Sequence, residues 1–230
     1  IDPSPLWDED GKVYLVHAFA RSRSGVKHLL QIHELSPEGD KVIDDGTIVF
    51  DGNPKHPTIE GPKFIKRNGY YYIFAPGGGV STGWQVVLRS KNIFGPYEDK
   101  IVLAQGDTEI NGPHQGGYVE LENGEGWFLH FQDKGVYGRI VHMQPVKWNK
   151  NWPVMGADPM KTGTGEPVLV YNKPKVEGKH PKLSLPTSDD FTNGYGLQWQ
   201  WHANFYDHWY STTEREGHLR LHSQFVREYM

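Results

Sequence analysis

Three segments of the chain share one pattern of hydrophobic and polar positions. Each starts with a polar residue and a glycine and continues as a short aromatic or β-branched run, as in the stretch from Asn68 to Phe74. Asn-Gly is a strong hairpin signal because both turn positions favour positive φ. The three segments are 10–16, 68–74 and 125–131, and a second apolar run follows each, at 28–35, 84–90 and 138–146. The pattern predicts three antiparallel hairpins.

These hairpins recur at a nearly constant distance along the chain. Gly11, Gly69 and Gly126 are 58 and 57 residues apart. A repeat of this kind, built from hairpins, is typical of propeller blades, whereas the strands of a β-sandwich, the alternative architecture, carry no such period. Residues 152–171, with an apolar run at 166–171, suggest a fourth unit. We therefore expect an all-β propeller of which about four blades are present.

The composition changes after the last unit. Residues 172–186 are rich in proline, lysine and glycine, which is typical of a linker. Beyond it, residues 197–202 and 218–222 alternate with period two, as half-buried strands do. We expect a propeller at 1–171, a linker at 172–186 and the truncated start of a β-sandwich domain at 187–230. Because the chain begins with Ile1 rather than methionine, we also expect it to be a piece of a longer protein.

Charge and composition narrow the classes of partner. The 230 residues carry a formal net charge of −4, which argues against nucleic acid as a partner. No apolar run approaches the roughly 18 residues of a membrane span, so we expect no membrane partner either. The chain has no cysteine, so its compartment cannot be read from disulfides, and for the full-length protein we expect a secreted or periplasmic location.

A polar residue precedes the glycine turn of each repeat at a similar distance. Asp2 and Glu60 each lie nine residues before their glycine, and His114 lies twelve before Gly126 or ten before Gly124. If the first strand of each blade lines a central channel, these side chains converge. Two carboxyl groups on one axis can divide the roles of acid and base that glycoside hydrolysis needs. Asp-Pro and Glu-Gly-Pro are also ordinary turn sequences, but their register with a histidine favours a site.

The motifs that carry these residues resemble those of glycoside hydrolase family 43, over residues 1 to about 171. They are Ile1-Asp2-Pro3-Ser4-Pro5-Leu6-Trp7-Asp8-Glu9-Asp10-Gly11, Ile59-Glu60-Gly61-Pro62-Lys63, Gly112-Pro113-His114-Gln115-Gly116-Gly117 and Tyr137-Gly138-Arg139, followed by Gln144-Pro145-Val146-Lys147-Trp148. The tail resembles the β-sandwich that follows the propeller in the β-xylosidase-like members. The resemblance implies a five-bladed propeller that hydrolyses β-xylosides or α-L-arabinofuranosides of plant cell-wall polysaccharides with inversion.

The resemblance also implies a role for individual residues. Glu60 matches the general acid, and Asp2 matches the aspartate that tunes the pKa of that acid and orients it. Arg139 matches a sugar-binding arginine. His114 matches a channel histidine, which is expected to bind substrate and to lie near a structural calcium ion or the water bound to it. No cofactor is required for the reaction. The general base is expected upstream of Ile1, in a first blade that this chain lacks.

Trp84 is a further substrate-binding candidate. It follows the run Gly77-Gly78-Gly79, which lets a ligand approach the backbone, and it would serve as a stacking platform for a sugar or pack in the core. No Gly-Lys-Ser/Thr follows the glycines, so a phosphate loop is not indicated.

Two alternative functions remain open at this point. A non-catalytic carbohydrate-binding propeller would have no specific need for Glu60. A different five-bladed hydrolase family, which acts on fructosides, is characterised by Arg-Asp-Pro and Glu-Cys motifs, and this chain has neither.

Overall fold

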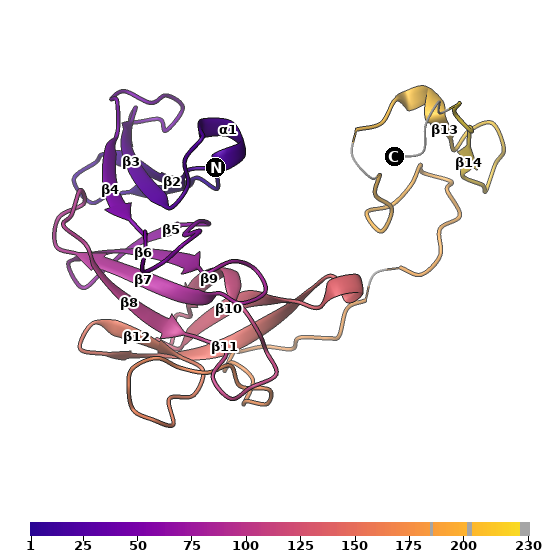
Figure 1. Cartoon of the computed structure of the whole chain (residues 1–230). Coiled ribbons are helices and arrows are strands. Elements are labelled where there is room, and N and C mark those ends of the chain that lie inside the picture. Colours follow the sequence, from indigo (N-terminus) through magenta and orange to yellow (C-terminus); the bar gives the residue numbers. More distant parts are fainter. Residues whose placement is uncertain (185, 202–203, 226–230) are drawn as a thin grey trace. The chain divides into compact units, whose positions relative to one another are not determined.

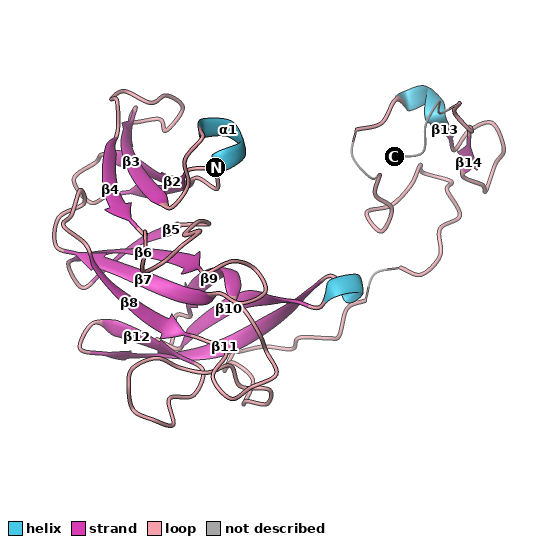
Figure 2. Ribbon diagram, in the orientation of Figure 1, coloured by secondary structure: helices cyan, strands magenta, loops and turns pink. Residues whose placement is uncertain are grey.

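The computed structural model describes residues 1–184, 186–201 and 204–225, and it divides the chain into two compact units. The first unit is Ile1–Lys175 and the second is Val176–Met230 (Figure 1). Among the described residues, no helix is long and apolar enough to span a membrane. The only α-helix described in the first unit, α1 (Arg21–Ser24), is a single turn, so the unit is almost entirely strand and loop (Figure 2).

Three four-stranded antiparallel sheets make up the first unit. In each sheet the strands follow one another in chain order, as in a simple meander. The strands of the first sheet are β1 (Ser4–Trp7), β2 (Val13–Ala18), β3 (Leu29–Leu35) and β4 (Thr47–Asp51). Those of the second are β5 (Lys63–Arg67), β6 (Tyr70–Gly77), β7 (Trp84–Ser90) and β8 (Glu98–Leu103). Those of the third are β9 (His114–Glu120), β10 (Gly126–Asp133), β11 (Arg139–Asn149) and β12 (Trp152–Met155), with the 3₁₀ turn η1 (Gly135–Tyr137) between β10 and β11.

The sheets coincide with the predicted repeats. The three predicted hairpins become β2–β3, β6–β7 and β10–β11, and in each sheet the short strand before the glycine turn comes first. At the middle turn Asn68 and Gly69 both have positive φ, at 51° and 70°, as the Asn-Gly signal requires.

Two hydrophobic clusters join neighbouring sheets. The first cluster fills the space between the first and second sheets, with Val16, Leu30, Ile32, Ile73 and Leu88 at its centre, each fully buried. The second lies between the second and third sheets, where Phe74 stacks on Tyr118 at 5.8 Å and on Phe128 at 6.3 Å. Facing sheets that bury their apolar sides against each other in sequence are what a blade repeat needs, because one blade alone cannot bury its faces.

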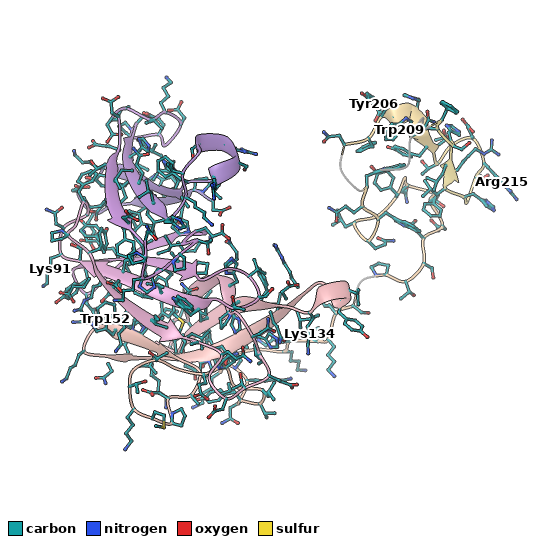
Figure 3. All side chains as sticks on the ribbon, viewed as in Figure 1. Lys91, Lys134, Trp152, Tyr206, Trp209 and Arg215 are labelled. Carbon is teal, nitrogen blue, oxygen red and sulfur yellow. The ribbon has the colours of Figure 1, made fainter. Side chains whose placement is uncertain are left out.

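Polar contacts also join neighbouring sheets. The carboxylate of Asp8, in the turn after β1, accepts hydrogen bonds from Lys66 of β5 and from Tyr71 of β6. Burial raises the pKa of Asp8, but these donors outweigh burial and the pKa lies below its ordinary value. Arg89 of β7, in the second sheet, lies over the ring of Trp152 on β12 of the third sheet, 4.2 Å from the ring centroid. Trp152 is labelled in Figure 3.

The predicted fourth unit is wrong. Residues 152–155 form β12, which pairs with β11 and completes the third sheet. The run at 166–171 is not a strand; Glu166 makes only an isolated bridge to Ala157, and Gly165 makes one to Leu103. The described part of the first unit therefore contains three sheets rather than about four. Because β11 pairs with β10 on one side and with β12 on the other, it has no free edge with which residues 166–171 could pair.

The second unit contains little regular structure. It has the 3₁₀ turn η2 (Asp207–Trp209) and a two-stranded sheet of β13 (Tyr210–Ser211) and β14 (Arg220–Leu221). The strand predicted at 197–202 is wrong for residues 197–201, and His202 lies outside the described residues. Of the strand predicted at 218–222, only Arg220 and Leu221 are extended and paired. Aromatic rings hold this unit, as where Tyr206 meets Trp209 edge to face at 5.1 Å (Figure 3).

Candidate functional site

The candidate residues lie where each sheet begins. Asp2 stands two residues before β1, Glu60 three residues before β5, and His114 is the first residue of β9. The backbone turns sharply at these points, since Asp2 and Gln115 have positive φ, at 52° and 48°, although neither is a glycine. Positive φ is uncommon for residues other than glycine, and the cases that do occur are concentrated at functional sites. The same end of each sheet therefore presents a polar side chain.

Glu60 and His114 meet directly. The imidazole Nε2 of His114 lies 2.9 Å from Oε1 of Glu60, a hydrogen-bond distance across 54 residues of sequence. His114 is 1% exposed, whereas the side chain of Glu60 is 32% exposed. A buried histidine thus holds one oxygen of a carboxylate whose remainder is open to solvent or a ligand.

The charges around Glu60 are positive. The hydrogen bond from His114 lowers its pKa, burial raises it, and the charges of His114, Arg139 and Lys27 lower it further, so that the pKa lies below its ordinary value. A general acid needs the opposite shift, because it must hold its proton near neutral pH. In this chain by itself Glu60 is therefore in the ionised form at neutral pH.

Arg139 joins the cluster through an aromatic ring. It is the first residue of β11, and its guanidinium carbon lies 4.5 Å from the ring centroid of Phe131 on β10. The other neighbour of that ring is His114, whose imidazole meets it at 5.6 Å and 67°. Glu60, His114, Phe131 and Arg139 thus form a continuous series of contacts.

Asp2 reaches the cluster by a longer path. Nε2 of Gln115 lies 3.5 Å from Oδ2 of Asp2, at the outer limit of a hydrogen bond, and Gln115 follows His114 directly. The charge of Asp2 also acts on Lys63, whose ammonium donates to the carbonyls of Gly61 and Pro62. Burial lowers the pKa of Lys63, and Asp2 offsets part of that effect.

Trp84 lies apart from these four candidates. Its indole N–H donates to Nδ1 of the fully buried His56 at 3.1 Å, and Nε2 of His56 is 2.8 Å from a carboxylate oxygen of Asp99. The ring packs against the core between the first and second sheets. Its polar atom is therefore occupied by a core contact, and its assignment as a sugar platform stays a prediction.

The charged and histidine side chains of the described residues do not by themselves gather into a metal site. Among residues 1–184, 186–201 and 204–225, no group of three or more His, Asp or Glu side chains is placed to hold a metal ion. His114 does have one buried atom without a partner, its Nδ1. Calcium takes six to eight oxygen ligands, so a ring nitrogen does not fit it directly. The calcium ion stays a prediction, with contact to His114 only through water.

Sequence reasoning missed Phe131 and Gln115. Phe131 ends the predicted strand 125–131 and looked like an ordinary strand residue, and Gln115 lies in the motif around His114 but was given no role. Their contacts depend on which residues face each other across β9 and β10, and that register shifts between Leu129 and Phe131. Proximity of Gln115 to His114 in the sequence was the one available signal.

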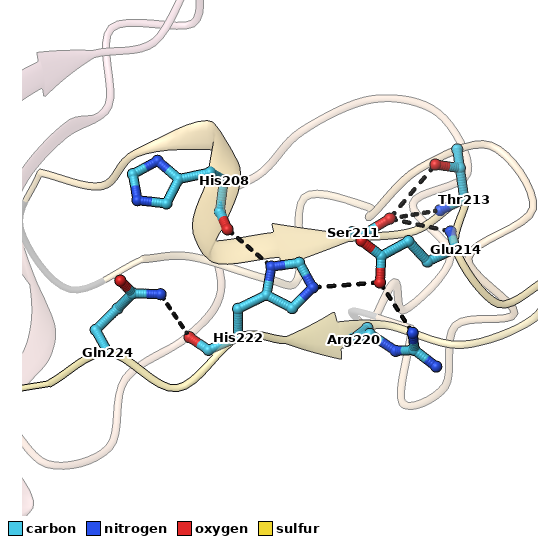
Figure 4. A network of polar contacts seen from close by, with 7 residues as sticks. All are labelled: His208, Ser211, Thr213, Glu214, Arg220, His222 and Gln224. Atoms are coloured by element: carbon cyan, nitrogen blue, oxygen red, sulfur yellow. Dashed lines mark hydrogen bonds and ion pairs between the residues drawn. The ribbon is translucent and has the colours of Figure 1, made fainter.

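A second cluster with the same residue types lies in the second unit (Figure 4). Glu214 accepts from Arg220 at 2.9 Å and is 3.3 Å from Nε2 of His222. Nδ1 of His222 is bonded to the carbonyl of His208 at 2.8 Å. These side chains are 34–48% exposed, so the cluster lies at the surface of its unit.

Comparison with known proteins gives consistent matches over both units. Residues 1–153 match the family model of glycosyl hydrolases family 43, and residues 188–228 match that of the beta xylosidase C-terminal concanavalin A-like domain. A putative beta-xylosidase of Xylanibacter ruminicola is 46% identical over 220 residues, which cover 96% of this chain and 40% of that protein. A non-reducing end alpha-L-arabinofuranosidase of Bacteroides ovatus is 32% identical over 179 residues, covering 70% of this chain and 32% of that protein.

Solved structures agree with the fold. The xylan beta-1,4-xylosidase from Bacillus halodurans C-125 superposes with a TM-score of 0.79 at 26% identity, over 98% of this chain and 45% of that one. The chain thus spans less than half the length of these proteins. Together with the three four-stranded sheets, the match confirms the predicted class: an all-β propeller followed by the start of a β-sandwich.

Proposed function

The chain belongs to glycosyl hydrolases family 43, and from this membership we propose that the protein that carries it hydrolyses β-xylosides or α-L-arabinofuranosides of plant cell-wall polysaccharides. The observation that carries the proposal is the series Glu60–His114–Phe131–Arg139, which joins a carboxyl group just before β5 to a guanidinium at the start of β11. A carboxyl group suits proton transfer, and a guanidinium suits binding of sugar hydroxyls.

In the proposed reaction Glu60 donates a proton to the glycosidic oxygen as the bond to the anomeric carbon breaks. A water molecule attacks that carbon from the opposite face and loses a proton to a carboxylate base, which none of the residues discussed above supplies. Inverting enzymes keep their two carboxyl groups about 6.5–9.5 Å apart so that this water fits between them. Asp2 orients Glu60 and tunes its pKa, the buried His114 holds the carboxyl group of Glu60 through its hydrogen bond, and Arg139 holds the sugar.

The cationic surroundings of Glu60 set a condition on this role. Glu60 becomes an acid only if its pKa rises in the working enzyme, and two physical effects act in that direction. A bound sugar excludes water and increases burial, and a nearby carboxylate disfavours the ionised form. We therefore propose that Glu60 takes up its proton in the assembled site with substrate bound.

The alternative is a propeller that binds carbohydrate without cleaving it. The ionised Glu60 favours this alternative, because a carboxylate can bind a sugar by accepting hydrogen bonds from its hydroxyl groups and needs no proton to do so. The two proposals differ in what Glu60→Gln does: a binder keeps its affinity and has no activity to lose.

Proton NMR of the first-formed product decides between them. On an aryl β-xyloside or aryl α-L-arabinofuranoside, the proposal expects hydrolysis with the inverted anomer appearing first, and expects Glu60→Gln to bind substrate without turnover. A retained anomer contradicts the inverting mechanism. Binding without hydrolysis by the unmodified protein supports the carbohydrate-binding alternative.

A further inference from the structure

Phe131 occupies a central place among the candidate residues. It lies on β10, is 8% exposed, and faces His114 on β9 and Val141 on β11. Its ring forms a T-shaped pair with the imidazole of His114 and lies beside the guanidinium of Arg139. Phe131 therefore connects the residue that holds Glu60 to the residue assigned to the sugar.

Arg139 depends on this ring for its position. The arginine is exposed, and among the described residues no carboxylate lies within ion-pair distance of it. It follows Gly138, whose φ of 77° gives the chain a conformation that other residues rarely adopt. A long side chain without an ionic partner samples many rotamers unless a surface supports it. The phenyl face of Phe131, 4.5 Å from the guanidinium carbon, is such a surface.

The ring itself is held firmly. Phe131 lies on β10, an inner strand of the four-stranded third sheet, which pairs with β9 on one side and with β11 on the other. His114 packs against its face, and His114 is fixed in turn by the hydrogen bond to Glu60. These contacts link the ring that supports Arg139 to His114 and through it to Glu60.

We propose that Phe131 is a positioning residue that places the guanidinium of Arg139 for sugar binding, acting through its phenyl face. The proposal rests on the proposed function for its catalytic consequence, since Arg139 is the sugar-binding residue there. Phe131 itself does not contact the reacting atoms. A planar guanidinium stacks on an aromatic face in a way that an aliphatic side chain does not reproduce.

Trp127 provides a matched control. It lies on the same strand as Phe131, four residues earlier and therefore on the same face, and is 6% exposed. Its ring meets Tyr171 edge to face at 5.9 Å, so it also has one aromatic contact, but at the end of β10 far from Arg139. Loss of a buried aromatic ring from this face is common to both positions, whereas support of Arg139 belongs to Phe131 alone.

A double-mutant cycle on kcat/KM tests the proposal in the protein that carries this chain. Phe131→Leu is expected to lower kcat/KM by about tenfold, mainly through KM, and to lower it by less than about threefold when Arg139→Ala is already present. Phe131→Tyr keeps the aromatic face and is expected to retain activity within about twofold of the original. Trp127→Leu is expected to act equally in both backgrounds. An equal loss from Phe131→Leu in both backgrounds would overturn the proposal.

A second measurement does not depend on activity. ¹⁵N relaxation of the Nε–H group of Arg139 reports how firmly its guanidinium is held. The order parameter is expected to fall in Phe131→Leu and in the volume-matched Phe131→Met, and to stay unchanged in Phe131→Tyr and Trp127→Leu. An unchanged order parameter in Phe131→Leu and Phe131→Met would overturn the positioning role. A protein that hydrolyses no glycoside would instead contradict the proposed function, and the relaxation data would still decide the role of Phe131.

Discussion

Two clusters in this chain contain a glutamate, a histidine and an arginine, and their surroundings differ. In the first unit His114 is 1% exposed and bonds to Glu60 at 2.9 Å. In the second unit His222 is 34% exposed and lies 3.3 Å from Glu214, which is 44% exposed (Figure 4). Similar residues thus form one buried contact at the start of a sheet and one solvated contact on a loop.

The difference shows that residue type alone does not make a site. Water and counter-ions screen the exposed cluster, and exposed ion pairs contribute little to stability. Around Glu60 the strands β5, β9 and β11 fix the partners before any ligand arrives. Preorganised groups of this kind are what catalysis uses, because they do not have to reorient during the reaction.

The largest expected difference between the clusters is in catalysis. Glu60→Gln is expected to lower kcat/KM for a xylo-oligosaccharide by about 10²–10⁴-fold, the usual contribution of a general acid. The matched change Glu214→Gln is expected to leave kcat/KM unchanged. Steady-state kinetics of both variants checks the pair, and similar losses in the two would remove the distinction between the clusters.

The histidines are expected to differ in how they influence the pH profile. His114 lowers the pKa of Glu60, so His114→Gln raises that pKa. Because a general acid is active only while protonated, the alkaline limb of kcat/KM is expected to move to higher pH in this variant, together with a loss of about tenfold at the optimum. His222→Gln serves as the control and is expected to leave both limbs in place. A limb that stays fixed in His114→Gln contradicts the assignment.

The pH dependence of the free energy of unfolding is expected to have one sign for the buried His130 and the opposite sign for the exposed His222. Burial lowers the pKa of His130 to about 4, from an ordinary value of 6.5. The unfolded chain then binds a proton that the folded chain does not, so the free energy of unfolding falls as pH drops from about 6.5 to about 4, by roughly 3 kcal/mol in all. Urea unfolding at pH 7 and pH 4.5 measures this loss, and His130→Gln is expected to reduce the pH dependence.

His222, in the exposed cluster, is expected to change stability with pH in the opposite direction and by the smallest amount. Hydrogen bonds to the carbonyl of His208 and to Glu214 raise the pKa of His222 above its ordinary value. Its small contribution to stability is therefore present below pH 6.5 and is lost as pH rises through the raised pKa. NMR titration is expected to show the pKa of His222 returning toward 6.5 in 1 M salt, with no change in His130. If the pKa of His222 did not change with salt, the pair of His222 and Glu214 would not be screened by the solvent.

The strand repeat and the end of the sheets that carries Asp2, Glu60 and His114 were predictable from the sequence, whereas the residues that contact these side chains were not. Asn68-Gly69 and the spacing of Asp2, Glu60 and His114 carried enough information because turns and strand starts are local features. The run at 166–171 misled because a run of apolar residues does not say which strand edge is free, and β12 already pairs with β11. As a result Val170 is 88% exposed.

The aromatic residues of the second unit misled for a related reason. The alternation at 197–202 predicted a strand, but the ring of Trp201 stacks on Phe205 at 5.4 Å and lies 5.7 Å from Tyr210. The aromatic side chains pack against one another here without forming a sheet. Phe131 was missed because its contacts follow from the register between β9 and β10, which a local pattern does not contain.

The dependence of Glu60→Gln on the leaving group tests the central claim, that Glu60 is the proton donor, most directly. A leaving group of low pKa departs without a proton, whereas a sugar alcohol does not. The account predicts that Glu60→Gln loses about 10²–10⁴-fold in kcat/KM on a xylo-oligosaccharide and far less on a dinitrophenyl xyloside. An equal loss on both substrates would contradict it, since Glu60 would then support binding or folding rather than proton transfer.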